Sequence, residues 1–223
     1  MSRVALVTGG TRGIGEDISI KLKDAGYTVA ANYAGNDTAA AEFSERTGIK
    51  AYKFDVSDFD AVHSGIAAIE ADLGPIEVLV NNAGITRDGT MHRMTFEQWD
   101  AVIQTNLASC FNCSRAVIEG MREREFGRIV NIGSMWARQA VKATPSSAYS
   151  MAKAGLHALT QHMAMELADH NIRVNAVSPA VVKTPIYEAF VDPADPNRVI
   201  CDVGRHAHMW RTSMDDFARC YLH

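Results

Sequence analysis

Six short runs, most of them apolar, alternate along the chain with longer segments in which apolar residues recur every three or four positions. The runs lie at residues 4–7, 28–32, 50–54, 78–80, 128–132 and 173–177. Short continuous apolar runs are typical of strands buried on both faces, and the three-to-four spacing is typical of amphipathic helices. Strands that alternate with helices predict an α/β protein with a parallel sheet covered by helices on both faces.

The helical segments carry recognisable ends. The first spans residues 14–25 and closes at Gly26, and a capping box at 57–60 opens a helix through Leu73. Further helices are expected at 37–46, at 95–121 and from Ser146 or Ser147 through Met163. From residue 192 the pattern changes: prolines interrupt it, no further apolar run follows, and only 215–218 can start a helix. We expect one domain at 1–190 and an atypical carboxyl-terminal segment at 191–223 that lacks a last strand and is truncated or frame-shifted.

The length, net charge and apolar runs of the chain limit the classes of protein to which it can belong. A chain of 223 residues fits a single domain with a sizeable core. The net charge of −4 gives no electrostatic reason to expect nucleic acid or an anionic membrane as a partner. We see neither an apolar run long enough to span a bilayer nor a signal peptide, so we expect a cytoplasmic protein.

Two of the four cysteines, Cys110 and Cys113, form a CxxC pair. Such a pair can serve redox chemistry or bind a metal. This one lies inside a helical pattern, away from a helix start that would stabilise a thiolate, and no second Cys/His cluster completes a zinc site. We therefore interpret both as structural cysteines and expect no metal.

A glycine-rich turn follows the first strand. It reads Thr8-Gly9-Gly10-Thr11-Arg12-Gly13-Ile14-Gly15 and leads directly into the first helix. Glycines in this position allow a tight turn and let backbone N–H groups approach a pyrophosphate at the helix start. A glycine-rich turn is common on its own, so its position between a strand and a helix is what points to a dinucleotide site. The glycine spacing is looser at the front than in the common GxGxxG motif.

A second group of residues points to proton transfer. Tyr149 and Lys153 are four residues apart on a predicted helix, which stacks them about 6 Å apart on one face. A lysine ammonium ~4 Å from a phenol would stabilise the phenolate by roughly 4 kcal/mol, which would lower the tyrosine pKa toward neutrality. Ser134 follows the strand at 128–132, at the sheet edge where α/β proteins bind ligands. Each feature alone is common, so their combination carries the argument.

Together these residues resemble the short-chain dehydrogenase/reductase family. The resemblance covers residues 1 to about 190 and rests on the glycine-rich turn, Asn81-Asn82-Ala83-Gly84, Asn106, Ser134, and Tyr149 with Lys153, in the family's order. The segment at 82–130 looks most like the acetoacetyl-CoA and 3-oxoacyl-acyl-carrier-protein reductases of that family. The resemblance implies a Rossmann-like doubly wound sheet and hydride transfer between a nicotinamide cofactor and a carbonyl or alcohol.

The resemblance also implies residue roles. Tyr149 would be the general acid, Ser134 would bind the substrate oxygen, Lys153 would lower the tyrosine pKa and hold the nicotinamide ribose, and Asn106 would support a proton-relaying water. The residues expected to contact the cofactor are Gly9, Thr11, Arg12, Gly13, Ile14, Asp55, Val56, Asn82, Ala83, Gly84, Tyr149, Lys153, Pro179, Val182 and Thr184. Those expected to contact the substrate are Asp88, Ser134, Trp136, Gln139 and Tyr149.

The sequence departs from the closest reductases in three places. Ser134 and Tyr149 are two residues farther apart than usual, so the loop that carries Trp136 should shape the substrate pocket differently. Ala180 replaces a glycine, where its methyl group would crowd the nicotinamide. The family's last apolar strand and glycine-rich end do not follow.

These observations lead to a specific hypothesis. We expect an NADPH-dependent reductase of a 3-oxoacyl thioester, forming a homo-oligomer, a tetramer in the family. NADP(H) is preferred over NAD(H) because 32–34 hold no carboxylate at the end of the second strand and Arg12 can reach a 2′-phosphate. The longer loop favours a dehydrogenase of a sugar, polyol or other secondary alcohol instead. A nucleotide-binding protein without catalysis is the alternative from another class.

Overall fold

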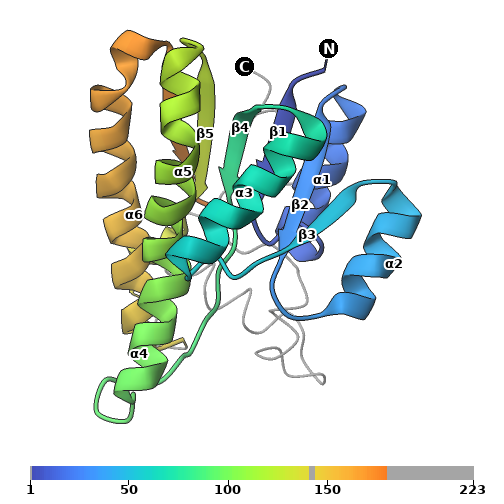
Figure 1. Cartoon of the computed structure of the whole chain (residues 1–223). Coiled ribbons are helices and arrows are strands. Elements are labelled where there is room, and N and C mark those ends of the chain that lie inside the picture. The colour runs from blue at the N-terminus through green and yellow to red at the C-terminus, as the bar shows by residue number, and fades with distance from the viewer. Residues whose placement is uncertain (1, 141–143, 180–223) are drawn as a thin grey trace.

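The computed structural model describes residues 2–140 and 144–179. Its strands form one sheet and its helices flank the sheet (Figure 1). The strands are β1 (Val4–Val7), β2 (Thr28–Tyr33), β3 (Lys50–Lys53), β4 (Ile76–Asn81), β5 (Gly127–Ile132) and β6 (Ile172–Val177). The helices are α1 (Gly13–Asp24), α2 (Asp37–Thr47), α3 (Phe59–Leu73), α4 (Phe96–Ile103), α5 (Ser109–Glu123) and α6 (Ser147–Glu166), with short turns η1 (Gln104–Ala108), η2 (Met135–Ala137) and η3 (Ala168–His170).

The sheet of the described residues is six-stranded and parallel, in the order β3-β2-β1-β4-β5-β6. The chain builds outward from β1 in one direction and then from β4 in the other, so the strand order reverses between β1 and β4. In open α/β sheets ligands bind at the carboxyl ends of the strands, at such a reversal. The predicted α/β class and doubly wound arrangement are confirmed.

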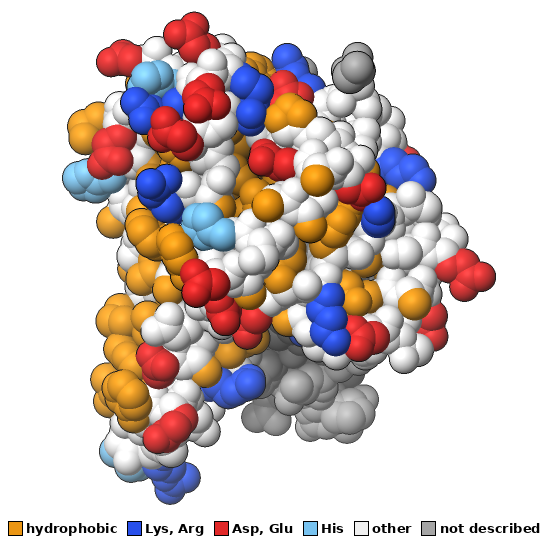
Figure 2. Space-filling model, viewed as in Figure 1, with side chains coloured by type: hydrophobic (Ala, Val, Ile, Leu, Met, Phe, Trp, Pro, Cys, Tyr) orange, Lys and Arg blue, Asp and Glu red, His pale blue; other side chains and the backbone are white. Residues whose placement is uncertain are grey.

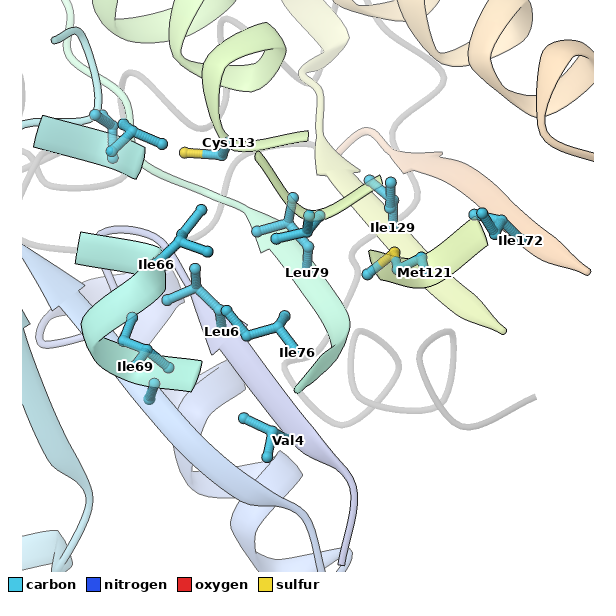
Figure 3. Close-up of a cluster of buried hydrophobic side chains, with 14 of the residues drawn as sticks. Val4, Leu6, Ile66, Ile69, Ile76, Leu79, Cys113, Met121, Ile129 and Ile172 are labelled. Atoms are coloured by element: carbon cyan, nitrogen blue, oxygen red, sulfur yellow. The ribbon is translucent and has the colours of Figure 1, made fainter. Parts of the chain in front are cut away.

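Apolar side chains of the strands point alternately to two cores. Leu6, Leu79 and Ile129 face α3 and α5, whereas Val7, Ala31 and Val80 face α1 and α2. In Figure 3, Ile66 and Ile69 of α3 lie over Leu6 and Ile76 of the sheet. Burial on both faces explains why β1, β2 and β4 read as nearly continuous apolar runs, whereas β3 and β6 also carry exposed polar side chains.

The boundaries differ from the sequence-based expectations in a few places. Strand β4 is Ile76–Asn81, longer than the predicted 78–80, and β3 ends at Lys53. The expected capping box at 57–60 is wrong: Asp58 is the N-cap of α3, and its carboxylate accepts the Ala61 N–H at 2.9 Å. The single helix predicted at 95–121 is interrupted by the π-helical turn η1, which contains Asn106.

Some expectations fall on residues that the structure does not describe. Ala180, Val182, Thr184 and the whole segment at 191–223 lie outside the described residues. Within residues 2–140 and 144–179, no helix combines the length and apolar character that a membrane crossing needs.

Candidate active site

A cavity of about 720 Å³ runs along the carboxyl ends of the strands, from β2 to β5. Its volume is in the range of small-molecule and cofactor sites. Most of the residues predicted for the cofactor, the substrate and catalysis line it together. They are Gly9, Thr11, Arg12, Gly13, Ile14, Asp55, Val56, Asn82, Ala83, Gly84, Asp88, Asn106, Ser134, Trp136, Tyr149, Lys153 and Pro179.

The glycine-rich turn is held in place by the end of β4. The Thr8 hydroxyl accepts the N–H groups of Asn82 and Ala83 at 2.9 and 3.0 Å. In return, the Asn82 amide donates to the carbonyl oxygens of Thr8 at 2.9 Å and Gly9 at 3.2 Å. A Cβ at Gly15 would lie 2.1 Å from the Gly9 carbonyl oxygen, so only glycine allows the turn to fold against α1. This leaves a backbone cradle at the start of a twelve-residue helix, which fits a pyrophosphate group.

The far end of the cavity lies at the end of β2. Asn32 is buried there and acts as a brace, since it accepts the Gly9 N–H at 3.3 Å and donates to the Phe54 carbonyl at 2.9 Å. The Asn32 side chain thus uses its amide oxygen and nitrogen in hydrogen bonds within the fold. Residues 32–34 hold no carboxylate; the next acid along the chain is Asp37, the first residue of α2, which accepts a hydrogen bond from Lys53 at 2.8 Å.

Ser134, Tyr149 and Lys153 meet at the other end. Ser134 is 7% exposed at the end of β5, and its hydroxyl accepts the Trp136 N–H at 3.3 Å. Tyr149 lies in the first turn of α6, near enough to Ser134 for that side chain to lower its pKa. One turn later, buried Lys153 donates to the Ile132 carbonyl at 2.6 Å, and its ammonium is 5.7 Å from the centre of the Tyr149 ring. The helical spacing therefore brings the three side chains to one place.

The pKa of Tyr149 departs from the sequence-based expectation. Burial raises it above the ordinary value of a tyrosine, the Ser134 hydrogen bond acts in the opposite direction, and the charge of Asp88 raises it further. Burial likewise lowers the pKa of Lys153. The expected drop toward neutrality is therefore wrong for the protein as it stands, because desolvation outweighs the attraction that the spacing suggested. Tyr149 is protonated at neutral pH.

Asn106 faces the cavity from the π-helical turn. Its amide N–H group donates to the carbonyl oxygens of Val102 and Ile85, both at 2.9 Å. Its side-chain oxygen is buried and has no hydrogen-bond partner among the described residues. A Cβ at Gly84 would lie 2.6 Å from that oxygen, so glycine at this position leaves room for the asparagine. Turns of π-helix inside longer helices are frequent at functional sites.

The loop after Ser134 closes the substrate end of the cavity. The Trp136 indole N–H donates to the Thr144 hydroxyl at 3.0 Å, and the Gly89 N–H donates to the Pro145 carbonyl at 2.8 Å. Thr144 and Ser146 line the cavity with Trp136 and Asp88, whereas Gln139 is not among the lining residues. Sequence reasoning missed Thr144 and Ser146 because their place depends on how the loop closes, which no motif signals.

The two cysteines of the CxxC pair are free and buried in the α5 region. Burial raises the pKa of both thiols, which makes them poor nucleophiles and metal ligands. Cys113 is part of the core formed with α3, so the structural interpretation is confirmed. The described residues contain no cluster of His, Cys, Asp and Glu side chains that could hold a metal ion.

Comparison with known proteins agrees with this geometry. A sequence profile of the short chain dehydrogenase family matches residues 3–194. An acetoacetyl-CoA reductase of Paracoccus denitrificans is 54% identical over 222 residues, which cover 100% of this chain and 90% of that protein. Another, from Shinella zoogloeoides, is 54% identical over 200 residues, covering 90% and 82%.

The solved structure of a gluconate 5-dehydrogenase from Burkholderia cenocepacia, in complex with NADP and tartrate, has the same fold with a TM-score of 0.81. It is 31% identical, and the match covers 90% of this chain and 80% of that one. The profile match and these relatives show that the chain belongs to the short-chain dehydrogenase family of oxidoreductases.

Proposed function

We propose that this protein reduces the ketone of a 3-oxoacyl thioester such as acetoacetyl-CoA, with NADPH as the preferred cofactor. The observation that carries the proposal is that Ser134, Tyr149 and Lys153 line one cavity together with the glycine-rich turn. The 54% identical relatives named acetoacetyl-CoA reductase support the substrate class.

The side chains have distinct parts in this reaction. A bound nicotinamide supplies the hydride. Ser134 hydrogen-bonds the ketone oxygen, and Tyr149 gives its proton to that oxygen as the alcohol forms. The raised pKa of Tyr149 suits this direction of reaction, because a phenol must be protonated to act as an acid. The Lys153 ammonium is 5.7 Å from the centre of the Tyr149 ring. From there its charge stabilises the phenolate that remains, and it can help to return a proton to that phenolate.

The cofactor would lie along the cavity in the order of its lining residues. The glycine-rich turn would hold the pyrophosphate, Asp55 and Val56 the adenine, and Asn82 to Gly84 the middle of the molecule. Asn106 would support a relay water from its π-helical turn, and Pro179 would cover the nicotinamide. Val182 and Thr184 are proposed for the same cover and lie outside the described residues.

A sugar or polyol substrate is the second candidate. It is favoured by the NADP-bound gluconate 5-dehydrogenase structure and by the long loop that positions Trp136. Asp88 argues against a sugar acid, since its carboxylate lines the cavity and would repel a second carboxylate near Tyr149. A thioester has no charge next to its ketone.

Oxidation of NADPH, followed by absorbance, tests the proposal. Acetoacetyl-CoA, 5-ketogluconate and a neutral cyclic ketone are compared at equal concentration, with Tyr149→Phe as the inactive control. The proposal expects a kcat/KM for acetoacetyl-CoA at least about 100-fold above that for ketogluconate, or roughly 2.7 kcal/mol of transition-state binding. Faster turnover of ketogluconate would establish the second candidate. Binding of NADPH without turnover of any ketone would indicate a nucleotide-binding protein.

We also propose that the enzyme is a cytoplasmic homo-oligomer. Large apolar side chains are exposed on the helices around the active site: Phe96 of α4 at 74%, Phe111 of α5 at 52%, and Met151 and Met165 of α6 at 45% and 69%. Figure 2 shows hydrophobic side chains gathered along the edge of the molecule where these helices lie. An exposed apolar surface of this kind favours association. Light scattering after size exclusion measures the oligomeric state.

A further inference from the structure

A trio of polar side chains, Tyr33, Lys53 and Asp37, lies beside the cavity end where β2 and β3 finish. The sheet register places Tyr33 of β2 directly opposite Lys53 of β3. Asp37 is the first residue of α2, and its carboxylate accepts a hydrogen bond from the Lys53 ammonium at 2.8 Å. Burial and the nearby Asp37 raise the pKa of Tyr33. Figure 1 shows β2, β3 and α2 together on this side of the sheet.

Asp37 and Lys53 lie just outside the cavity's nucleotide end and are not among its lining residues. The chain neighbours Tyr33, Asn36 and Ala39 do line the cavity, as does Arg12. An acidic residue near the end of the second strand is what NAD sites use to bind the ribose hydroxyls, and its charge opposes the 2′-phosphate of NADPH. The trio therefore has an acid near the place where an NADPH site should avoid a free negative charge.

The stability of the fold does not explain why Lys53 pairs with Asp37. The Lys53 and Asp37 side chains are 52% and 64% exposed. Exposed ion pairs contribute little to stability, and Asp37 already has a favourable place in the first turn of α2. An aspartate is ionised at neutral pH, and the Lys53 hydrogen bond lowers the pKa of Asp37 further. The negative charge of Asp37 is therefore present when a cofactor binds, with the Lys53 ammonium 2.8 Å from it.

We infer that Lys53 is a cofactor-specificity residue: its ammonium neutralises Asp37, so that the end of the cavity near Arg12 accepts the 2′-phosphate of NADPH. Lys53 acts through Asp37 and need not touch the cofactor, which makes it a positioning residue. The inference rests on the proposed preference for NADPH. It adds that the preference for NADPH over NADH depends on the neutralisation of Asp37 by Lys53 and not only on Arg12.

Four proteins test it: wild type, Lys53→Met, Asp37→Asn and the double variant. The dissociation constants of NADPH and NADH are measured by the fluorescence of the bound dinucleotide, so the readout does not depend on turnover. We expect Lys53→Met to weaken NADPH binding about three- to tenfold, as for unit charges near a wet protein surface. Its binding of NADH should stay within about twofold or tighten, since the freed carboxylate can accept the ribose hydroxyls.

The double variant separates masking from direct contact. If Lys53 only masks Asp37, removing both charges restores NADPH binding to within about twofold of wild type, by the logic of a double-mutant cycle. If the double variant binds NADPH as weakly as Lys53→Met, Lys53 contacts the phosphate itself. That result would overturn the inference that Lys53 acts by neutralising Asp37. Higher salt should shrink the defect of Lys53→Met, because the repulsion acts through solvent.

Lys50→Met is the matched control. Lys50 begins the same strand and pairs with Asp72, and, unlike Asp37, neither of these residues has chain neighbours that line the cavity. It should leave both dissociation constants unchanged; a loss of NADPH binding equal to that of Lys53→Met would point to a general charge effect and overturn the inference. If the wild type binds NADPH and NADH equally well, the proposed cofactor preference fails. If it prefers NADPH and Lys53→Met keeps that preference, only the role of Lys53 fails.

Discussion

At the scale of single residues, the substrate end of the cavity depends on one hydrogen bond in the loop between Ser134 and α6. The Trp136 indole is half-buried and bonds the Thr144 hydroxyl at 3.0 Å. Both residues line the cavity, and Ser134 caps the short turn that contains Trp136. The indole therefore forms a cavity wall whose position is set by a threonine eight residues away.

We predict that Thr144→Val raises the KM for acetoacetyl-CoA about two- to tenfold with little change in kcat, since one neutral hydrogen bond contributes about 0.5–1.5 kcal/mol. Thr144→Ser keeps the hydroxyl and should restore the wild-type KM. Steady-state kinetics with saturating NADPH provides both numbers. Equal KM values for the valine and serine variants would show that the bond does not position the indole.

The residue scale also shows how far sequence reasoning reaches. The spacing of Tyr149 and Lys153 correctly placed both side chains on one face of α6, because a helix repeats every 3.6 residues whatever surrounds it. Their association with Ser134 came from the family resemblance. The spacing gave the wrong direction for the Tyr149 pKa. That direction depends on burial and on Asp88, which the chain brings close only through the folded loop. The helical spacing of two residues can be predicted from the sequence, whereas the burial of a side chain such as Tyr149, and its effect on the pKa, cannot.

At the scale of elements, helix α6 is tied to the segment that follows β6. His157 lies one turn beyond Lys153, and its Nε2 is 2.9 Å from the Ser178 hydroxyl. A Cβ at Gly133 would lie 2.5 Å from that hydroxyl oxygen, so the pair packs directly on the end of β5. The tie connects the helix of Tyr149 with the residue before Pro179, which lines the cavity.

This tie predicts a pH-dependent stability. Burial lowers the pKa of His157, and the nearby charges of Arg138 and Lys153 lower it further. The unfolded chain, with a histidine pKa of about 6.5, then binds the proton more readily than the fold. The contribution of His157 to stability is therefore present above about pH 6.5 and is lost as the pH falls from there through the lower folded pKa.

Thermal melting between pH 7.5 and 5.0 measures the effect. The wild type should lose melting temperature across this range, and His157→Gln should lose less, because glutamine cannot take up the proton. The acids Asp37 and Asp72, whose pKa values are lowered by Lys53 and Lys50, act in a lower window, below about pH 4. Parallel curves for the wild type and the glutamine variant would contradict this role of His157.

The elements themselves were largely predictable. The strands β1, β2 and β4 were found because burial on both faces leaves a nearly continuous apolar run. The outer strands β3 and β6 carry exposed polar side chains and have no such run. The π-helical turn was not predictable, since residues 95–121 have the pattern of one unbroken helix. The turn coincides with tertiary hydrogen bonding, in which the Asn106 amide reaches the Ile85 carbonyl of another segment. The spacing of apolar residues within one helix does not indicate a hydrogen bond to another segment of the chain.

At the scale of the molecule, one cavity connects segments that lie far apart in the chain. It runs from Arg12 and Tyr33 at one end to Ser134 and Tyr149 at the other, across the point where the strand order reverses. A dinucleotide that fills it would touch both halves of the sheet. Binding should therefore stabilise the whole fold instead of one loop.

We predict that NADPH at 100 times its dissociation constant stabilises the protein by about 2.7 kcal/mol. For a chain of this size that corresponds to a rise in melting temperature of roughly 5–10 °C. Arg12→Ala should reduce the rise with NADPH at the same concentration and leave the rise with NADH nearly unchanged, since only NADPH carries the 2′-phosphate. An equal reduction with both cofactors would show that Arg12 does not read the phosphate.

The most direct test of the proposed chemistry is the single-turnover rate of Tyr149→Phe with bound NADPH and saturating acetoacetyl-CoA. Phenylalanine keeps the ring and removes only the hydroxyl. We expect the rate to fall at least about 100-fold, as for the loss of a general acid, while the dissociation constant of NADPH changes less than about threefold. A variant that kept a tenth of the wild-type rate would show that Tyr149 is not the proton donor.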